Sequence, residues 1–186
     1  MRKLFLFILF SFFSITSFAD ILFIDLNYSI NEVQAIREYA RTNKIKLHLF
    51  PERTPQDEKK LEPIWRRLDT LHTLRKNCKK NCERIDQEIN QRIEEMQNIV
   101  KEKIAKVDAA EFKRITSLLN SNNVSLQHVI FSGHSGGSFF SGVFGNLNLS
   151  EIKEGFDSNI NLIADTQSIL IWGCYGGTLN SLYNSW

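Results

Sequence analysis

Two residues of this chain, His134 and Cys174, could act together as a base and a nucleophile. A thiolate attacks a carbonyl carbon far better than a hydroxyl does, and an adjacent imidazole can take the thiol proton and later donate it to the leaving amine. Backbone amides nearby would stabilise the oxyanion. Glycines that let the backbone approach a substrate flank both residues: Gly133, Gly136 and Gly137 around His134, and Gly173, Gly176 and Gly177 around Cys174.

The chain has two further cysteines, and they give Cys174 a competing interpretation. Cys78 and Cys82 lie close together in a polar, turn-like run, and we expect them to form a disulfide in an oxidising compartment. Cys174 is then left over, either as a reactive thiol or as a buried structural cysteine. One histidine and one cysteine do not make a zinc centre, so we expect no metal and no cofactor. The other histidines (His48, His72 and His128) are interpreted as structural or solvated.

Four short apolar runs are predicted to be the strands that position these residues. They span residues 21–26, 45–50, 128–134 and 168–172, and helical patterns separate them. Ser29-x-x-Glu32 predicts a capping box at the first helix, Asp108-x-x-Glu111 starts a later one, and residues 150–164 are expected to be helical. Alternating strands and helices indicate a three-layer, doubly wound, mostly parallel sheet. His134 and Cys174 would then lie at the carboxyl ends of neighbouring strands, where such sheets bind ligands.

A charged segment without glycine interrupts this pattern from residue 56 to residue 107. It carries two apolar stripes at helical spacing, and the second has the spacing of a coiled-coil seam: Leu61, Ile64, Leu68, Leu71 and Leu74, then Ile85, Ile89, Ile93, Met96, Val100, Ile104 and Val107. We interpret this segment as an inserted helical hairpin with the Cys78–Cys82 turn at its tip. One long helix is the alternative.

The first nineteen residues have the layout of a secretory signal peptide. Arg2 and Lys3 precede an apolar run, and Ser17-Phe18-Ala19 provides small residues at the two positions that a signal peptidase reads. A retained membrane anchor is the alternative, although the run is shorter than the roughly 20 residues that span a bilayer. We therefore expect a periplasmic or secreted mature domain, residues 20–186, with no membrane contact after cleavage.

Cleavage would leave a mature domain without net charge. It would reduce the Lys and Arg count from 23 to 21, equal to the 21 Asp and Glu, which gives no indication of nucleic-acid binding.

The runs Val129-Ile130-Phe131-Ser132-Gly133-His134 and Ile169-Leu170-Ile171-Trp172-Gly173-Cys174 resemble the two signature blocks of the caspase-like cysteine peptidases, which include caspases, metacaspases, legumains, gingipains and clostripains. The resemblance spans residues 21–186 without the hairpin. It implies a caspase-like fold and an endopeptidase in which Cys174 is the nucleophile and His134 is the general acid and base. It also implies oxyanion donors at the Cys174 amide and at an amide just after His134, Ser135 or Gly136. The family usually has glycine directly after the histidine, where this chain has Ser135.

Other functions also fit the sequence. Residues 133–137 match the G-x-S-x-G elbow of serine α/β-hydrolases with Ser135 as nucleophile, but no histidine follows to complete that triad. A catalytically inactive scaffold whose hairpin binds a partner is the second alternative. The caspase-like core has more strands than this sequence shows, so a polypeptide substrate and a second chain or a C-terminal half that completes the sheet are the expected partners.

Overall fold

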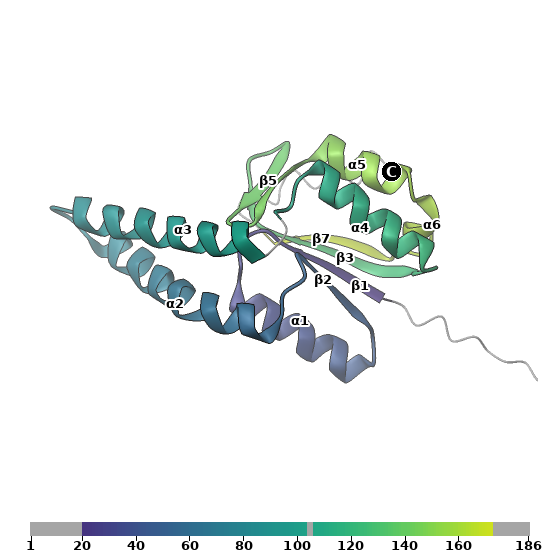
Figure 1. Ribbon diagram of the computed structural model, residues 1–186, viewed down its shortest axis with the longest axis horizontal. Helices are drawn as coiled ribbons and strands as arrows, with labels where there is room; N and C mark the ends of the chain where they lie inside the picture. Colours follow the sequence, from purple (N-terminus) through teal and green to yellow (C-terminus); the bar gives the residue numbers. More distant parts are fainter. Residues whose placement is uncertain (1–19, 104–105, 173–186) are drawn as a thin grey trace, which may run out of the picture.

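The computed structural model describes residues 20–103 and 106–172, and it is a mixed α/β fold (Figure 1). Four strands form the main sheet: β1 (Asp20–Asp25), β2 (Leu47–Phe50), β3 (Leu126–Ser132) and β7 (Ser168–Trp172). Their order is β2-β1-β3-β7, and each neighbouring pair is parallel. The expected α/β fold with a parallel sheet is confirmed.

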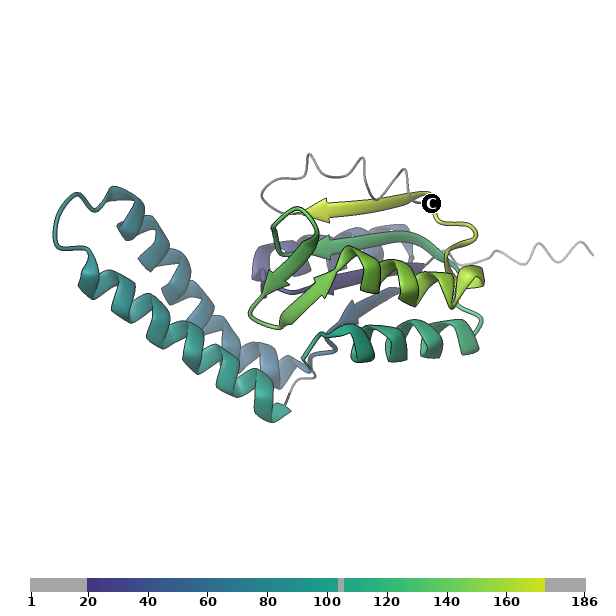
Figure 2. The ribbon, with the colours of Figure 1, turned by 90° about the horizontal axis from the view of Figure 1, so that it is seen from above.

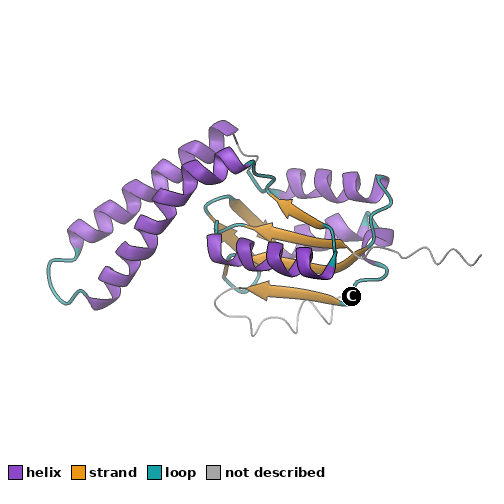
Figure 3. Cartoon of the chain, turned by 90° about the horizontal axis from the view of Figure 1, so that it is seen from below, coloured by secondary structure: helices purple, strands orange, loops and turns teal. Residues whose placement is uncertain are grey.

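Helices cover both faces of this sheet (Figure 3). On one face α1 (Ile30–Asn43) packs Val33, Ile36 and Ala40 against alternate residues of β1 and β3. On the other face lie α4 (Ala109–Ser121), α5 (Leu149–Asp157) and the short α6 (Ile160–Ile163). The largest buried side chains on that face include Phe112, Phe131 and Phe156. The continuous apolar runs of the strands follow from burial on both faces.

The helix expected over residues 150–164 is interrupted between α5 and α6. Asn159 leaves helical geometry, and its buried side-chain amide donates to Gly155 O at 2.8 Å and to Thr116 Oγ1 at 3.3 Å. Asparagine competes in this way with the helical backbone for hydrogen bonds. The bonds join the break to α4.

A second, antiparallel sheet was not predicted. It consists of β4 (His134–Ser135), β5 (Phe139–Gly142) and β6 (Gly145–Asn148) in that order. The third main strand therefore ends at Ser132 rather than at His134, and His134 begins the second sheet.

The segment between β2 and α4 contains α2 (Pro55–Asn77) and α3 (Glu83–Lys103), which extend side by side away from the sheet (Figures 1 and 2). Thr54 and Asp57 form a capping box at the start of α2. The expected helical position of Val107 is wrong. Val107 instead forms a β-bridge to Gly145, whose φ of 142° suits only glycine and whose added Cβ would lie 2.0 Å from Val107 O.

Apolar side chains join the two hairpin helices. Both helices contribute to the buried stripe: Leu61, Ile64, Leu68, Leu71, Ile89 and Met96. Ion pairs between Arg67 and Glu88 and between Arg75 and Asp86 flank the stripe, and a disulfide joins Cys78 and Cys82 at the tip. The side chains of Val100 and Ile104, expected in the same stripe, lie outside the described residues.

Gly155→Ala should lower the free energy of unfolding by up to about 2 kcal/mol, because overpacking the core costs about 1–3 kcal/mol and the alanine gains roughly 1 kcal/mol of helix propensity. An added Cβ would lie 2.7 Å from Cε1 of Phe112, whose fully buried ring packs edge-on against Phe156. Urea denaturation measures the difference, and a Phe112→Leu background should reduce it. A stabilised Gly155→Ala protein would contradict the described packing of α5 on α4.

Candidate functional site

His134 lies at the carboxyl edge of the main sheet. It follows the end of β3 by two residues, its side chain is exposed, and it pairs with Ser141 of β5. Just before it, the amide of Gly133 donates to Trp172 O at 3.1 Å. The predicted base therefore lies in the second sheet, directly after a residue that is bound to the end of β7.

β3 and β7 are adjacent and parallel, with Ser132 opposite Trp172 in the register. His134 and Cys174 each follow one of these two paired residues by two positions in the sequence. Cys174 itself lies outside the described residues. The structure thus binds Gly133, the residue before His134, to Trp172, the last described residue before Gly173-Cys174.

The segment after His134 bears on two predictions. Ser135 is 6% exposed, and within residues 20–103 and 106–172 its Oγ has no hydrogen-bond partner. A strand, β5, and not a helix follows it, whereas a nucleophile elbow turns directly into a helix. The amide of Gly136 donates to Phe139 O at 3.0 Å, so this N–H is already engaged within the protein.

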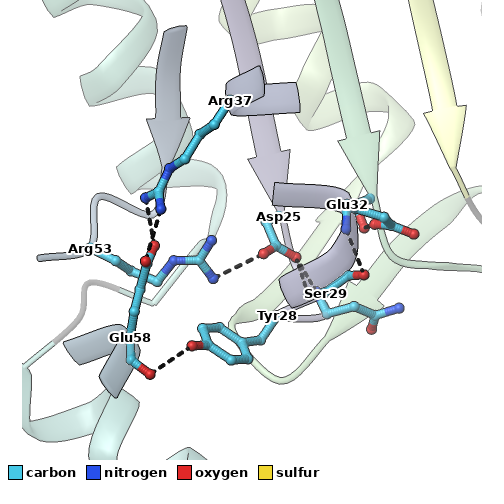
Figure 4. A network of polar contacts seen from close by, with 9 residues as sticks. Asp25, Tyr28, Ser29, Glu32, Arg37, Arg53 and Glu58 are labelled. Carbon is cyan, nitrogen blue, oxygen red and sulfur yellow. Dashed lines mark hydrogen bonds and ion pairs between the residues drawn. The ribbon is translucent and has the colours of Figure 1, made fainter. Parts of the chain in front are cut away.

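A buried ion pair lies at the same edge of the sheet (Figure 4). Arg53 Nη1 donates to Asp25 Oδ2 at 2.9 Å, with the two side chains 1% and 0% exposed. Burial raises the pKa of Asp25, and the Arg53 guanidinium opposes this shift. Removing one partner of such a pair leaves an uncompensated buried charge, which typically costs about 3–5 kcal/mol.

Asp25 also shapes the loop between β1 and α1. Its Oδ1 accepts the amides of Asn27 at 3.1 Å and of Ser29 at 3.4 Å. These bonds surround Tyr28, whose φ of 55° is left-handed and costs a non-glycine residue about 1 kcal/mol or more. The guanidinium of Arg53 lies 4.7 Å above the Tyr28 ring. One carboxylate and one guanidinium therefore hold this loop in a strained conformation.

The predicted capping box at Ser29 is only half formed. Ser29 Oγ accepts the Glu32 amide at 3.4 Å, as expected. The Glu32 carboxylate does not reach back to the Ser29 amide, because Asp25 already binds that amide. It instead accepts a hydrogen bond from the hydroxyl of Ser132, the last residue of β3. Burial raises the pKa of Glu32, and the Ser132 hydroxyl opposes this shift.

The first turns of α2 also contact this edge. Glu58 accepts two hydrogen bonds from the Arg37 guanidinium, at 2.5 and 2.8 Å, and its backbone carbonyl accepts the Tyr28 hydroxyl at 3.1 Å. The base of the hairpin is thus attached to both α1 and the β1–α1 loop (Figure 4).

The remaining histidines have other environments. His48 contacts Asp20 at 2.7 Å, His128 contacts Ser168 at 2.7 Å, and His72 is exposed on α2. Among residues 20–103 and 106–172, no group of three or more His, Cys, Asp or Glu side chains is arranged to hold a metal ion. In that same part of the chain, no helix has both the length and the apolar character needed to cross a membrane.

Sequence reasoning missed the Asp25–Arg53 pair and the Glu32–Ser132 contact. One signal was present, since Asp25 is the carboxylate that interrupts the apolar run Ile21-Leu22-Phe23-Ile24-Asp25-Leu26. A charge in a buried strand requires a partner, but nothing local identifies Arg53 as that partner.

These features define the class of protein as a mixed α/β domain with an inserted helical hairpin and a polar site at the carboxyl edge of its parallel sheet. Comparison with known proteins returned no family model, no curated protein and no solved structure that matches this chain.

Glu32→Gln should change how stability depends on pH. Because the folded-state pKa of Glu32 is raised, the folded protein holds this proton more tightly than the unfolded chain does. Its contribution to stability therefore falls as pH rises from the ordinary value of about 4.3 through the raised one. The free energy of unfolding of the variant, relative to the natural chain, should increase across that window and then level off.

Urea denaturation between pH 4 and pH 7 tests this expectation. Glu94→Gln, at an exposed position on α3, is the matched control and should show no such trend. A difference between Glu32→Gln and the natural chain that is constant with pH, or that falls, would contradict the raised pKa.

Proposed function

We propose that this chain is an exported cysteine endopeptidase with a caspase-like core, in which Cys174 is the nucleophile and His134 the general acid and base. The observation that carries the proposal is the parallel register of β3 and β7. Ser132 opposes Trp172 in this register, and His134 and Cys174 each follow one of these paired residues by two positions in the sequence. Loops at the carboxyl ends of parallel strands are where such folds bind ligands.

The chemistry follows from these two side chains. His134 takes the thiol proton of Cys174, and the thiolate attacks the scissile carbonyl carbon to form a tetrahedral oxyanion. Collapse of this species breaks the C–N bond, and His134 gives its proton to the leaving amine. Water then attacks the thioester with His134 as base, which releases the acid and regenerates the thiol.

The oxyanion requires donors that are not already engaged. The amides of Ser135 and Cys174 are the proposed donors, since the Gly136 amide donates to Phe139. The exposure of His134 on the sheet edge supports access of a polypeptide substrate. Residues 1–19 are proposed to direct export, which places the mature domain in the periplasm or outside the cell.

Two other proposals remain from the sequence. A catalytically inactive scaffold would use the projecting hairpin as its binding element, and the extension of α2 and α3 away from the sheet favours this alternative (Figure 2). A second chain or a C-terminal half would add strands beside β7, which stands at one end of the strand order.

Labelling of Cys174 tests the catalytic pair. The mature protein is treated with an iodoacetamide probe between pH 5 and pH 9 and analysed by peptide mapping. An unperturbed thiol, with a pKa of about 8.5, reacts slowly at pH 7. Paired with His134, Cys174 should alkylate roughly tenfold faster at pH 7 than in His134→Ala, because the imidazolium stabilises the thiolate.

His72→Ala, which changes an exposed histidine on the hairpin, is the matched control and should leave the rate unchanged. Fluorogenic peptide mixtures then test turnover, with Cys174→Ala as the inactive reference. If Cys174 alkylates at the same rate with and without His134, or does not react, the peptidase proposal fails and the scaffold proposal is favoured.

A further inference from the structure

We propose that Arg53 is a positioning residue for His134, so that the inserted hairpin is part of what builds the site. Arg53 lies two residues before the start of α2 and 81 positions before His134 in the sequence. Two separate chains of contacts start at its buried guanidinium. One ends at Ser132, two residues before His134, and the other ends at Ser141, the pairing partner of His134. The effect on catalysis rests on the proposed function, whereas the placement of His134 does not.

The first chain of contacts passes through the main sheet (Figure 4). The guanidinium binds Asp25, and Asp25 binds the amide of Ser29 at the start of α1. Ser29 caps the Glu32 amide, which fixes the first turn of the helix. The Glu32 carboxylate then binds the hydroxyl of Ser132, two residues before His134. This chain of contacts fixes where β3 ends.

The second chain of contacts passes through the small sheet. The guanidinium of Arg53 lies 5.1 Å from the ring centroid of Phe144, which occupies the turn between β5 and β6. The Phe144 amide donates to Leu26 O at 2.9 Å, just after the end of β1. On β5, Ser141 is the register partner of His134. The stacking of Arg53 on Phe144 therefore fixes the position of the β5–β6 turn. β5 leads into this turn and carries Ser141, the pairing partner of His134.

The polypeptide backbone that follows α3 also contacts the β5–β6 turn. Val107 donates its amide to Phe144 O at 2.7 Å, and its own carbonyl accepts the Asn146 amide at 3.1 Å. The segments before and after the hairpin thus both contact the β5–β6 turn, Arg53 through its guanidinium and Val107 through its backbone.

Placement of His134 matters because proton transfer is sensitive to geometry. A general base must lie within about 2.6–3.2 Å of the proton donor, and an error of about 1 Å can reduce the rate 100-fold. The guanidinium of Arg53 is buried and would not touch a substrate. Its proposed role is therefore to position His134. A purely structural role would lower stability without changing the surroundings of His134 in the folded protein.

The test combines Arg53→Met, Arg53→Lys and the control Arg66→Met, with two readouts. Arg66 is a matched control because it is an exposed arginine that binds a carboxylate, Glu62, on the same helix. The first readout is the NMR spectrum of the full mature chain labelled at histidine, which resolves the His134 ring and amide. The second is the pH profile of Cys174 alkylation.

Folded Arg53→Met should shift or split the His134 signals and slow Cys174 alkylation at pH 7 by at least threefold, towards the rate of His134→Ala. Arg53→Lys should recover part of the loss, because an ammonium can still neutralise Asp25 but lacks the planar group that stacks on Phe144. Arg66→Met should match the natural chain in both readouts.

Phe144→Leu and Ser132→Ala keep the test decisive if Arg53→Met does not fold. Each interrupts one chain of contacts and leaves the Asp25–Arg53 pair intact, so each should give a smaller shift of the His134 signals. Intact His134 signals and an unchanged pH profile in these two variants and Arg53→Lys would overturn the proposal.

The two readouts separate this proposal from the proposed function. A rate of Cys174 alkylation that does not depend on His134 in the natural chain refutes the catalytic pair. The histidine spectra still decide whether Arg53 positions His134.

Discussion

The buried contact between Asp25 and Arg53 is the constraint on which the carboxyl edge of the sheet depends. Both side chains are removed from water, so neither charge can be tolerated without the other. Through its second oxygen, Asp25 organises the β1–α1 loop, and the aromatic rings of Tyr28 and Phe144 pack on Arg53. The loss of either charge would consume a large fraction of the 5–15 kcal/mol that typically stabilises a domain. The Asp25–Arg53 pair therefore contributes both to the conformation of the β1–α1 loop and to the stability of the fold.

The parallel sheet determines which residues can meet at this edge. The carboxyl ends of β1, β2, β3 and β7 all lie at the same edge of the sheet, because every neighbouring pair is parallel. Asp25, Arg53 and His134 come from three of these loops or strand ends, which explains how residues far apart in sequence come to share one region. The small antiparallel sheet begins with His134 and then turns the chain back, so that His134 pairs with Ser141 of β5.

Local patterns in the sequence predicted the main strands and helices, because each signal lies within a few residues. The run Ser168–Trp172 was placed at its observed bounds, and the Asp108 cap begins α4 as expected. The small sheet was missed because its strands have four residues or fewer and glycine stands on both sides of the turn, so residues 134–148 show no run typical of a strand. Glu32 shows the same limit: its local pattern predicts a bond to Ser29, but its carboxylate binds Ser132, 100 residues away.

The place of the hairpin in the topology gives it a structural consequence. An insertion between β2 and α4 leaves the sheet from the carboxyl end of β2, the edge that carries His134. An insertion at the amino edge would be separated from that residue by the length of the strands. Here the segment just before α2 supplies Arg53, and the segment just after α3 supplies the Val107 bridge to Gly145. The hairpin therefore cannot be treated as an appendage, because the residues at both of its ends belong to the packing around the site.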